Sequence, residues 1–443
     1  MASFFLLLFV AHLALLRPLL QNGDSAVYNQ QIAECDLAGR TTHVGYFVLG
    51  ILFDRLLPFT TDLNMNVMVL LVGWLGLAAL YATTARLTES RLAALATVPM
   101  ALGLSAQLRG MLLSEVDGVS VAFVALSFAC FQRGAALVAG FLFGFSLLVT
   151  PLSGPLLTVF VVSAAVRALL NREGLRQQVR SLLALAAGSL LVYLPPVAFF
   201  FRDYVYGSRG LLHAPRASAS VPRRIAQSLD FITDQLGYML PLYVVGALVC
   251  LASPRLWRAG QPALALLLSV LLLAVVGQRF QDVPVQLPNL VLLGMLPAIA
   301  FAISRAWLRV GLSVLFCGCL LNVKSSYQSL FSDLRRSQQQ RELALEIRAL
   351  SAPRAPILVG LSGFHESRML ERYASSPEQS AKAIDWRTFP AEQERLLDPS
   401  FNAQVWFFHG VSPTQVAPLL TRYSFENRRA GKRNFKVLIP RSE

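Results

Sequence analysis

Two acidic segments carry the side chains of this sequence that are best suited to acid–base chemistry. Residues 23–46 read GDSAVYNQQIAECDLAGRTTHVGY and place Asp24 shortly after an apolar run, and residues 108–118 read LRGMLLSEVDG and contain Glu115 and Asp117. A carboxylate at the end of an apolar segment can act as a general base on a hydroxyl nucleophile or can position a divalent cation. Asp24 and Glu115 are therefore the candidate catalytic residues.

The two acids of the second segment are not equivalent. Glu115 and Asp117 lie two residues apart, so on a helix their side chains point roughly 160° away from each other. We therefore expect Glu115 to belong to the site and keep Asp117 as a secondary candidate. The alternative for any one of these acids is a solvated surface charge, which is the interpretation we adopt for Glu34 and Asp36 in the first segment.

Basic residues suggest a partner with a phosphate group. Arg279 lies in GQRFQDVP beside an aromatic residue, and a guanidinium there can bind a phosphate bidentately. The alternative for Arg279 is that it extends to lipid headgroups. His43 could contact a phosphate or a sugar hydroxyl, although a lone histidine in a loop is more often structural. Arg202 opens the segment 202–237, which mixes arginines with aromatic residues, and is a secondary candidate.

Composition identifies the kind of chain that must position these residues. Of its 443 residues 55% are hydrophobic and 14% are charged, with a mean hydropathy of +0.54, which indicates a polytopic membrane protein. The net charge of +14 fits arginines in cytoplasmic loops and at anionic lipid surfaces better than a nucleic-acid partner. The five cysteines form no even disulfide framework. Residues 1–20 lack a basic leading segment, so we expect a retained first helix.

About eleven apolar runs are long enough, or nearly long enough, to span a bilayer as helices. They cover residues 3–20, 64–84, 92–108, 117–132, 134–150, 156–170, 181–201, 238–252, 262–277, 287–303 and 307–321.

The charges between these spans predict their orientation. With a cytoplasmic N-terminus, one set of loops holds eleven arginines and two acids, and the opposite set holds nine arginines and eleven acids. Cytoplasmic loops of membrane proteins are rich in arginine and lysine, so the first set is predicted to be cytoplasmic. Asp24, Glu115 and Arg279 then lie on the outer side. The excess of arginine in the predicted cytoplasmic loops is kept only if the apolar segment 43–59 does not cross the membrane. We therefore expect a short interfacial helix there.

The last part of the chain is soluble in character. APILVGL, AQVWFFHG and NFKVLIP are predicted strands, and SGFHESRMLERYA and SPTQVAPLLTRY are predicted helices between them. This alternation indicates a small α/β domain, without a glycine-rich phosphate loop, on the outer face. We therefore divide the chain into a transmembrane domain (1–321), a helical connector (322–352) and an extracytoplasmic domain (353–443).

These segments together resemble the GT-C superfamily of membrane glycosyltransferases. GDSAVY followed by HVGY is similar to the first outer loop of protein O-mannosyltransferases and aminoarabinose transferases, SEVDG to their second acidic motif, and GQRFQDVP to a late arginine–aromatic motif. The match covers the architecture of the membrane region but only about twenty residues of motif. HVGY replaces a proline-rich turn and the first loop has no DxD, so the need for a divalent cation and the donor contacts stay open.

The resemblance implies an inverting transfer of a sugar from a polyprenyl-phosphate donor to an acceptor hydroxyl at the outer face. Asp24 would be the catalytic base or a metal-proximal carboxylate, Glu115 its partner, and Arg279, with His43, a binder of the donor phosphate. Membrane lipids surround the protein, a bacterial inner membrane is the expected location, and the acceptor is a glycan, a lipid or a protein. The alternatives are a transporter or lipid flippase, and a non-catalytic scaffold for the C-terminal domain.

Overall fold

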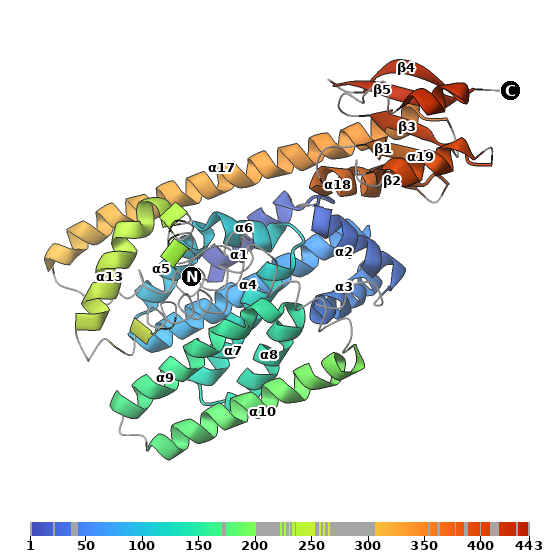
Figure 1. Ribbon diagram of the computed structural model, residues 1–443. Coiled ribbons are helices and arrows are strands. Elements are labelled where there is room, and N and C mark those ends of the chain that lie inside the picture. The colour runs from blue at the N-terminus through green and yellow to red at the C-terminus, as the bar shows by residue number, and fades with distance from the viewer. Residues whose placement is uncertain are drawn as a thin grey trace. The chain divides into compact units, whose positions relative to one another are not determined.

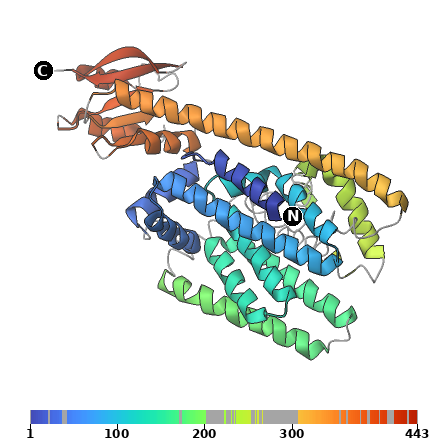
Figure 2. The same ribbon diagram turned by 180° about the vertical axis from the view of Figure 1, so that it is seen from behind.

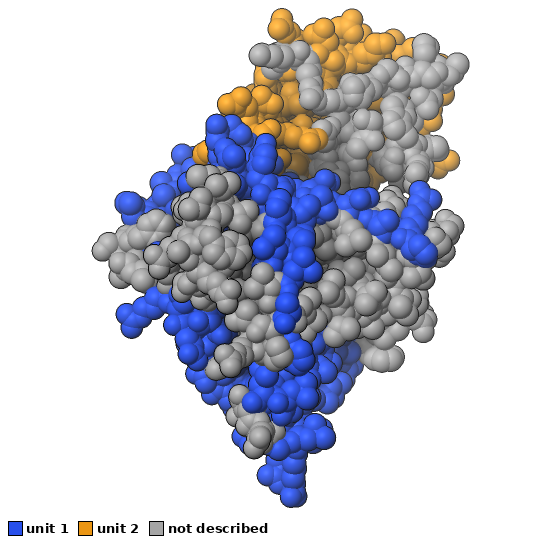
Figure 3. Space-filling view, turned by 90° about the vertical axis from the view of Figure 1, so that its left-hand side faces the viewer, with its two compact units in different colours: residues 1–17, 35–330 blue, residues 18–34, 331–443 orange. Residues whose placement is uncertain are grey.

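The computed structural model divides the chain into two compact units (Figure 3). Unit 1 comprises residues 1–17 and 35–330, and unit 2 comprises residues 18–34 and 331–443. The structure describes residues 2–20, 23–36, 43–170, 174–200, 222–223, 226, 230, 233–234, 236–252, 257, 260–261, 265, 306–352, 355–360, 364–376, 378–384, 389–398, 400–407, 416–430 and 433–441.

Unit 1 is helical throughout its described residues (Figure 1). Its elements are α1 (Ala2–Leu15), α3 (Val44–Leu56), α4 (Thr61–Thr88), α5 (Arg91–Leu102), α6 (Ser105–Leu112), α7 (Val116–Gln132), α8 (Ala136–Val149), the 3-10 helices η2 (Pro151–Leu156) and η3 (Gly237–Met239), α9 (Leu157–Leu170), α10 (Leu175–Phe199), α13 (Leu240–Ala252) and the first part of α17 (Ala306–Leu350).

Two described helices, α4 and α10, are long and apolar enough to cross a membrane, and six shorter apolar helices accompany them. In the most apolar stretch of α4, 61% of the residues are buried inside the protein, against 17% for α10. The exposed side chains of α10 include Leu183, Leu191 and Phe199. A helix that exposes such residues suits an apolar solvent, so α10 has the surface of a lipid-facing helix and α4 that of a central one.

Glycines let α8 and α10 pack backbone against backbone, and both ribbon views show the two helices side by side (Figure 1 and Figure 2). A Cβ added at Gly140 would lie 2.2 Å from the Leu185 carbonyl oxygen, and one at Gly188 would lie 2.4 Å from the Leu137 carbonyl oxygen. Gly144, four residues after Gly140, makes the same approach to α10. Small residues at this spacing are typical of helix pairs in membranes, where close packing replaces the hydrophobic effect as the source of association.

Among the described residues, the predicted spans agree with helices except at 3–20, where α1 already ends at Leu15, and at 92–108. There α5 ends at Leu102, Leu104 has extended backbone, and α6 begins at Ser105, so the prediction of one continuous span is wrong. The predicted short helix at 43–59 is present as α3, with 13 residues. The runs 262–277 and 287–303 lie outside the described residues apart from Ala265, and the count of eleven spans stays a prediction.

Unit 2 contains a five-stranded sheet with strand order β2-β1-β3-β5-β4. Its strands are β1 (Ile357–Gly360), β2 (Ala381–Ile384), β3 (Gln404–Phe407), β4 (Tyr423–Ala430) and β5 (Arg433–Pro440), and β1 pairs in parallel with both β2 and β3 while β5 is antiparallel to β3 and β4. Its other elements are α2 (Gly23–Glu34), the last part of α17, α18 (Phe364–Ala374), α19 (Phe389–Leu397) and the 3-10 helix η5 (Ala417–Thr421).

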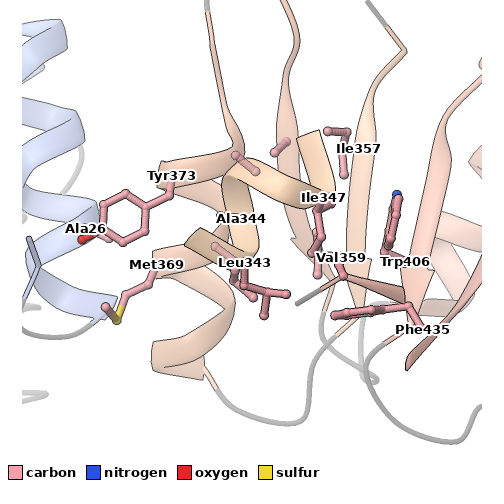
Figure 4. Packing of buried hydrophobic residues seen from close by; sticks show 14 of the residues in the cluster. Ala26, Leu343, Ala344, Ile347, Ile357, Val359, Met369, Tyr373, Trp406 and Phe435 are labelled. Atoms are coloured by element: carbon pink, nitrogen blue, oxygen red, sulfur yellow. The ribbon is translucent and has the colours of Figure 1, made fainter. Parts of the chain in front are cut away.

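Alternating side chains give the sheet two apolar faces. Ile357 and Val359 of β1 face one core cluster with Trp406 and Phe435, whereas Leu358 faces a second cluster on the other side. The first face is covered by the last turns of α17 and by α18, and α2 packs against α18 on the side away from the strands (Figure 4). Helices α19 and η5 contribute to the second face. The predicted α/β character of this region is confirmed.

Three details of unit 2 differ from the prediction. The predicted helix SPTQVAPLLTRY contains only the 3-10 turn η5 among its described residues, and its last residue, Tyr423, starts β4. Strands β2 and β4 and helix α19 were not predicted. The predicted connector 322–352 is helical, but its residues up to Leu350 continue α17 without a break from the last predicted span.

Candidate active site

Glu115 and Asp117 lie at the start of α7 and are both buried. Glu115 is the residue before the first turn, with extended backbone (φ −151°, ψ 146°), and its side chain does not cap the helix. The exposed fractions are 8% for Glu115 and 4% for Asp117. A solvated surface charge would be exposed, so this alternative is wrong for both residues. Burial of a carboxylate costs free energy, and carboxylates kept buried in this way are often functional.

A close contact between two helices fixes the backbone after Glu115. A Cβ at Gly118 would lie 1.9 Å from the Gly110 carbonyl oxygen, so α6 and α7 touch through their backbones at this point. Only glycine fits there, because any larger side chain would displace one helix from the other. The turn of residues 113–115 between α6 and α7 is therefore held at its far end by helix packing.

Asn66 of α4 fixes the backbone before Glu115. Its Oδ1 accepts a hydrogen bond of 2.7 Å from the Ser114 amide, and its Nδ2 donates one of 2.7 Å to the Arg17 carbonyl oxygen. The side chain is fully buried. Asn66 was not among the predicted site residues, although an amide inside an apolar run is the kind of signal that could have identified it.

His43 has a structural contact in the turn before α3. Its Nδ1 lies 2.7 Å from the carbonyl oxygen of Val149, the last residue of α8. Because a carbonyl can only accept, Nδ1 carries the proton and His43 satisfies one of the orphan carbonyls at the end of α8. Gly45 lets α3 approach the same helix end, where a Cβ would lie 3.0 Å from the Val149 nitrogen, and Tyr46 is fully buried. HVGY therefore packs α3 against α8, and a role of His43 at a phosphate stays a prediction.

Asp24 lies in the first turn of α2, in unit 2, and is partly buried. The helix is held by α18: the Leu20 amide donates a hydrogen bond of 2.8 Å to the Tyr373 hydroxyl, and Ala26 belongs to the buried cluster (Figure 4). Glu34, at the end of the same helix, is exposed, as is Asp36, in agreement with their prediction as surface charges.

The predicted site residues thus fall into three groups. Glu115, Asp117 and His43 belong to unit 1, and Asp24 belongs to unit 2, so the approach of Asp24 to Glu115 stays a prediction. Arg279 and Arg202 lie outside the described residues. Within the part of the chain that the structure describes, no three His, Cys, Asp or Glu side chains lie close enough to hold a metal ion.

A polar cavity of about 350 Å³ also lies in unit 1. Its walls are tied together by buried side chains of α17: Asn322 bonds to the Leu236 carbonyl oxygen and to the Tyr238 amide, and the Ser326 hydroxyl donates to the Gly103 carbonyl oxygen. The lining consists of Gly103, Ser105, Asp234, Gly237, Tyr238, Asn322, Ser325 and Ser326. Hydroxyl, amide and carboxylate groups of this kind suit a polar ligand.

Solved structures share this architecture over nearly the whole chain. The structure of ArnT from Cupriavidus metallidurans in the apo state aligns with 99% of this chain and 98% of its own, with a TM-score of 0.65 and 14% sequence identity. The chain has the GT-C fold. A second structure of the same ArnT, bound to undecaprenyl phosphate, aligns over the same shares with a TM-score of 0.62.

The GT-C fold is also that of a more distant neighbour. The archaeal oligosaccharyltransferase AglB from Archaeoglobus fulgidus, in complex with an inhibitory peptide and a dolichol-phosphate, aligns with 86% of this chain and 64% of its own, with a TM-score of 0.51 and 11% identity. No protein-family model matches the sequence, and no curated protein matches it significantly. The predicted resemblance to the GT-C superfamily is confirmed at the level of the fold.

Proposed function

We propose that this protein transfers a sugar from a polyprenyl-phosphate donor to an acceptor hydroxyl at the outer face of the membrane, with inversion at the anomeric carbon. The observation that carries this proposal is the GT-C fold over nearly the whole chain, which the ArnT structure displays with undecaprenyl phosphate bound. The AglB structure, similar over 86% of this chain, has a dolichol-phosphate. The membrane is proposed to be a bacterial inner membrane, with the C-terminal domain periplasmic or extracellular. The acceptor is a glycan, a lipid or a protein.

The proposed step needs one base and one cation. Asp24, with Glu115 as its partner, takes the proton of the acceptor hydroxyl while the hydroxyl oxygen forms a bond to the anomeric carbon. The bond from that carbon to the phosphate oxygen breaks on the opposite side, and the polyprenyl phosphate leaves with the electron pair. Arg279 stabilises the charge that develops on the leaving phosphate, and His43 is a further candidate for this contact.

Polar contacts in unit 1 support the predicted alternation of the spans. The Asn66 contacts join residues 17, 66 and 114, and the polar cavity joins residues near 103, 237 and 322, all predicted to be outer. Gln132 also contacts Gln261, and both lie at helix ends predicted to be cytoplasmic, whereas its second partner, Ser163, lies in the middle of α9. The Asn66 contacts and the polar cavity thus each draw their members from one predicted side.

Cysteine labelling tests which side is outer. Single cysteines introduced near residues 24, 115 and 360 are expected to react with a membrane-impermeant maleimide added to the outer side, once the five native cysteines have been replaced. A cysteine near residue 176 is the control for the opposite side. Labelling of residue 24, 115 or 360 only from the cytoplasm would overturn the proposed arrangement.

An Asp24→Asn variant tests the proposed base. The amide keeps the size of the side chain but cannot take a proton, so we expect sugar transfer by the purified protein to fall about 10²- to 10⁴-fold. Glu34→Gln, on the exposed end of the same helix, is the matched control and is expected to keep its activity. The measurement is the release of polyprenyl phosphate from a radiolabelled donor in liposomes, and full activity of Asp24→Asn would remove Asp24 from the mechanism.

The alternative is a transporter or lipid flippase with the same fold. It predicts movement of the intact donor across the membrane of the liposome without cleavage of the sugar–phosphate bond. The same radiolabelled donor separates the two functions, because transfer releases polyprenyl phosphate whereas transport leaves the donor intact.

A further inference from the structure

A buried amide connects the two polar segments of unit 1 that flank the candidate site. Asn66 bonds to the Arg17 carbonyl oxygen at one end of its side chain and to the Ser114 amide at the other. Arg17 is the last residue of unit 1 before the chain enters the segment that contains α2, and Ser114 directly precedes Glu115. Both distances are 2.7 Å, short for hydrogen bonds of this type.

Burying an amide at an exposed fraction of 0% is costly unless its polar atoms are bonded. The two hydrogen bonds offset this desolvation cost only while both partners stay in place. The Asn66 amide therefore stabilises one position of the Ser114 peptide. The Gly118–Gly110 contact holds the chain on the other side of Glu115. The chain is therefore held on both sides of Glu115, at Ser114 and at Gly118.

We propose that Asn66 is a positioning residue for Glu115 in the sugar-transfer reaction. The inference rests on the proposed function, because it gives Asn66 no contact with the substrate and lets it act only through the carboxylate. A displacement of a catalytic group by about 1 Å can cost about 100-fold in rate. A loss of the Asn66 bond to Ser114 permits a displacement of this kind.

Asn64 provides a matched control in the same helix. It is also fully buried, and its Nδ2 donates to the Asp54 carboxylate at 2.9 Å and to the Phe59 carbonyl oxygen at 3.1 Å. These contacts hold the turn between α3 and α4 rather than the segment before Glu115. Asn64→Leu and Asn66→Leu therefore each remove a fully buried side-chain amide, but the two amides hold different turns.

The test compares kinetics of the two variants in the full-length protein. Asn66→Leu is expected to lower kcat about 100-fold with the KM for the polyprenyl-phosphate donor changed less than about threefold. Asn64→Leu is expected to lower the unfolding temperature to a similar extent while kcat stays within about threefold of the wild type. In a Glu115→Gln background, Asn66→Leu is expected to lower the residual rate little further, because no carboxylate is left to misplace.

Hydrogen exchange at the Ser114 amide provides a readout that does not depend on activity. Asn66→Leu is expected to accelerate exchange in the peptide that contains Ser114, and Asn64→Leu to leave it unchanged. Equal losses of kcat in the two variants, or unchanged exchange at Ser114, would overturn the role of Asn66. Absence of donor turnover in the wild type would instead overturn the proposed function, and accelerated exchange would then still establish the contact as a structural one.

Discussion

Replacement of Glu115 by Gln is expected to abolish most of the sugar-transfer activity, with a loss of about 10²- to 10⁴-fold in kcat. The variant keeps the shape of a side chain that is 8% exposed and removes only its ability to carry a charge or take a proton. The backbone at this position is held by Asn66 on one side and by the Gly118–Gly110 contact on the other. The fold should therefore tolerate the change, and the loss should reflect chemistry.

Asp117→Asn is the matched control for this experiment. Asp117 is buried to a similar degree, but it lies in the first turn of α7, whereas Glu115 precedes the helix with extended backbone, so the two side chains leave the chain from different backbone conformations. We expect a loss below about tenfold, measured as the release of polyprenyl phosphate under saturating donor. A larger loss for Asp117→Asn than for Glu115→Gln would reassign the role to Asp117.

Replacement of Gly140 by Ala is expected to cause a large loss of stability through a single methyl group. The added Cβ would lie 2.2 Å from the Leu185 carbonyl oxygen and 2.9 Å from the Gly188 Cα, and neither backbone atom can rotate away. α8 and α10 would have to separate, at a cost of about 1–3 kcal/mol as seen for overpacked cores. In a bilayer the hydrophobic effect does not hold the two helices together, because lipid is as apolar as the helix surface, so their association depends on this close packing.

Gly174→Ala is the control for the glycine experiment, because no heavy atom lies within 4 Å of a Cβ at this position. The measurement is the unfolding temperature of the two variants in the same detergent. We expect a clear decrease for Gly140→Ala and none for Gly174→Ala. Equal unfolding temperatures would mean that the α8–α10 contact does not limit stability.

Strong periodic signals made much of the fold predictable from the sequence. The apolar runs correspond to helices in the described part of unit 1, and the strands β1, β3 and β5 were predicted because their residues are branched or aromatic and alternate between two buried faces. Strand β4 was missed because YSFENRRA is polar and lies at the edge of the sheet. Its place depends on pairing with β5, which the sequence of the strand alone does not reveal.

The sequence identified candidate site residues such as Glu115, but it did not identify the residues that hold their backbone in place. Glu115 was selected because it is an acid at the start of an apolar run, and its burial in the structure agrees with that choice. The helical state of α2 was not predicted, since GDSAVYNQQIAE is polar and its packing partner Tyr373 lies 353 residues away from Leu20. Asn66 was missed for the same reason: its two partners are 49 and 48 residues distant in the chain.

The membership of residues 18–34 in unit 2 has a consequence for biosynthesis. Leu20 and Ala26 are translated well before their partner Tyr373, which follows 353 residues after Leu20. At about 5–20 residues per second, the segment that carries Asp24 waits roughly 20–70 s for the helix that holds it. A nascent chain that has not reached Tyr373 therefore lacks the partner that holds the segment carrying Asp24. Under the proposed function, the protein could not begin to consume its lipid-linked donor until translation has passed Tyr373.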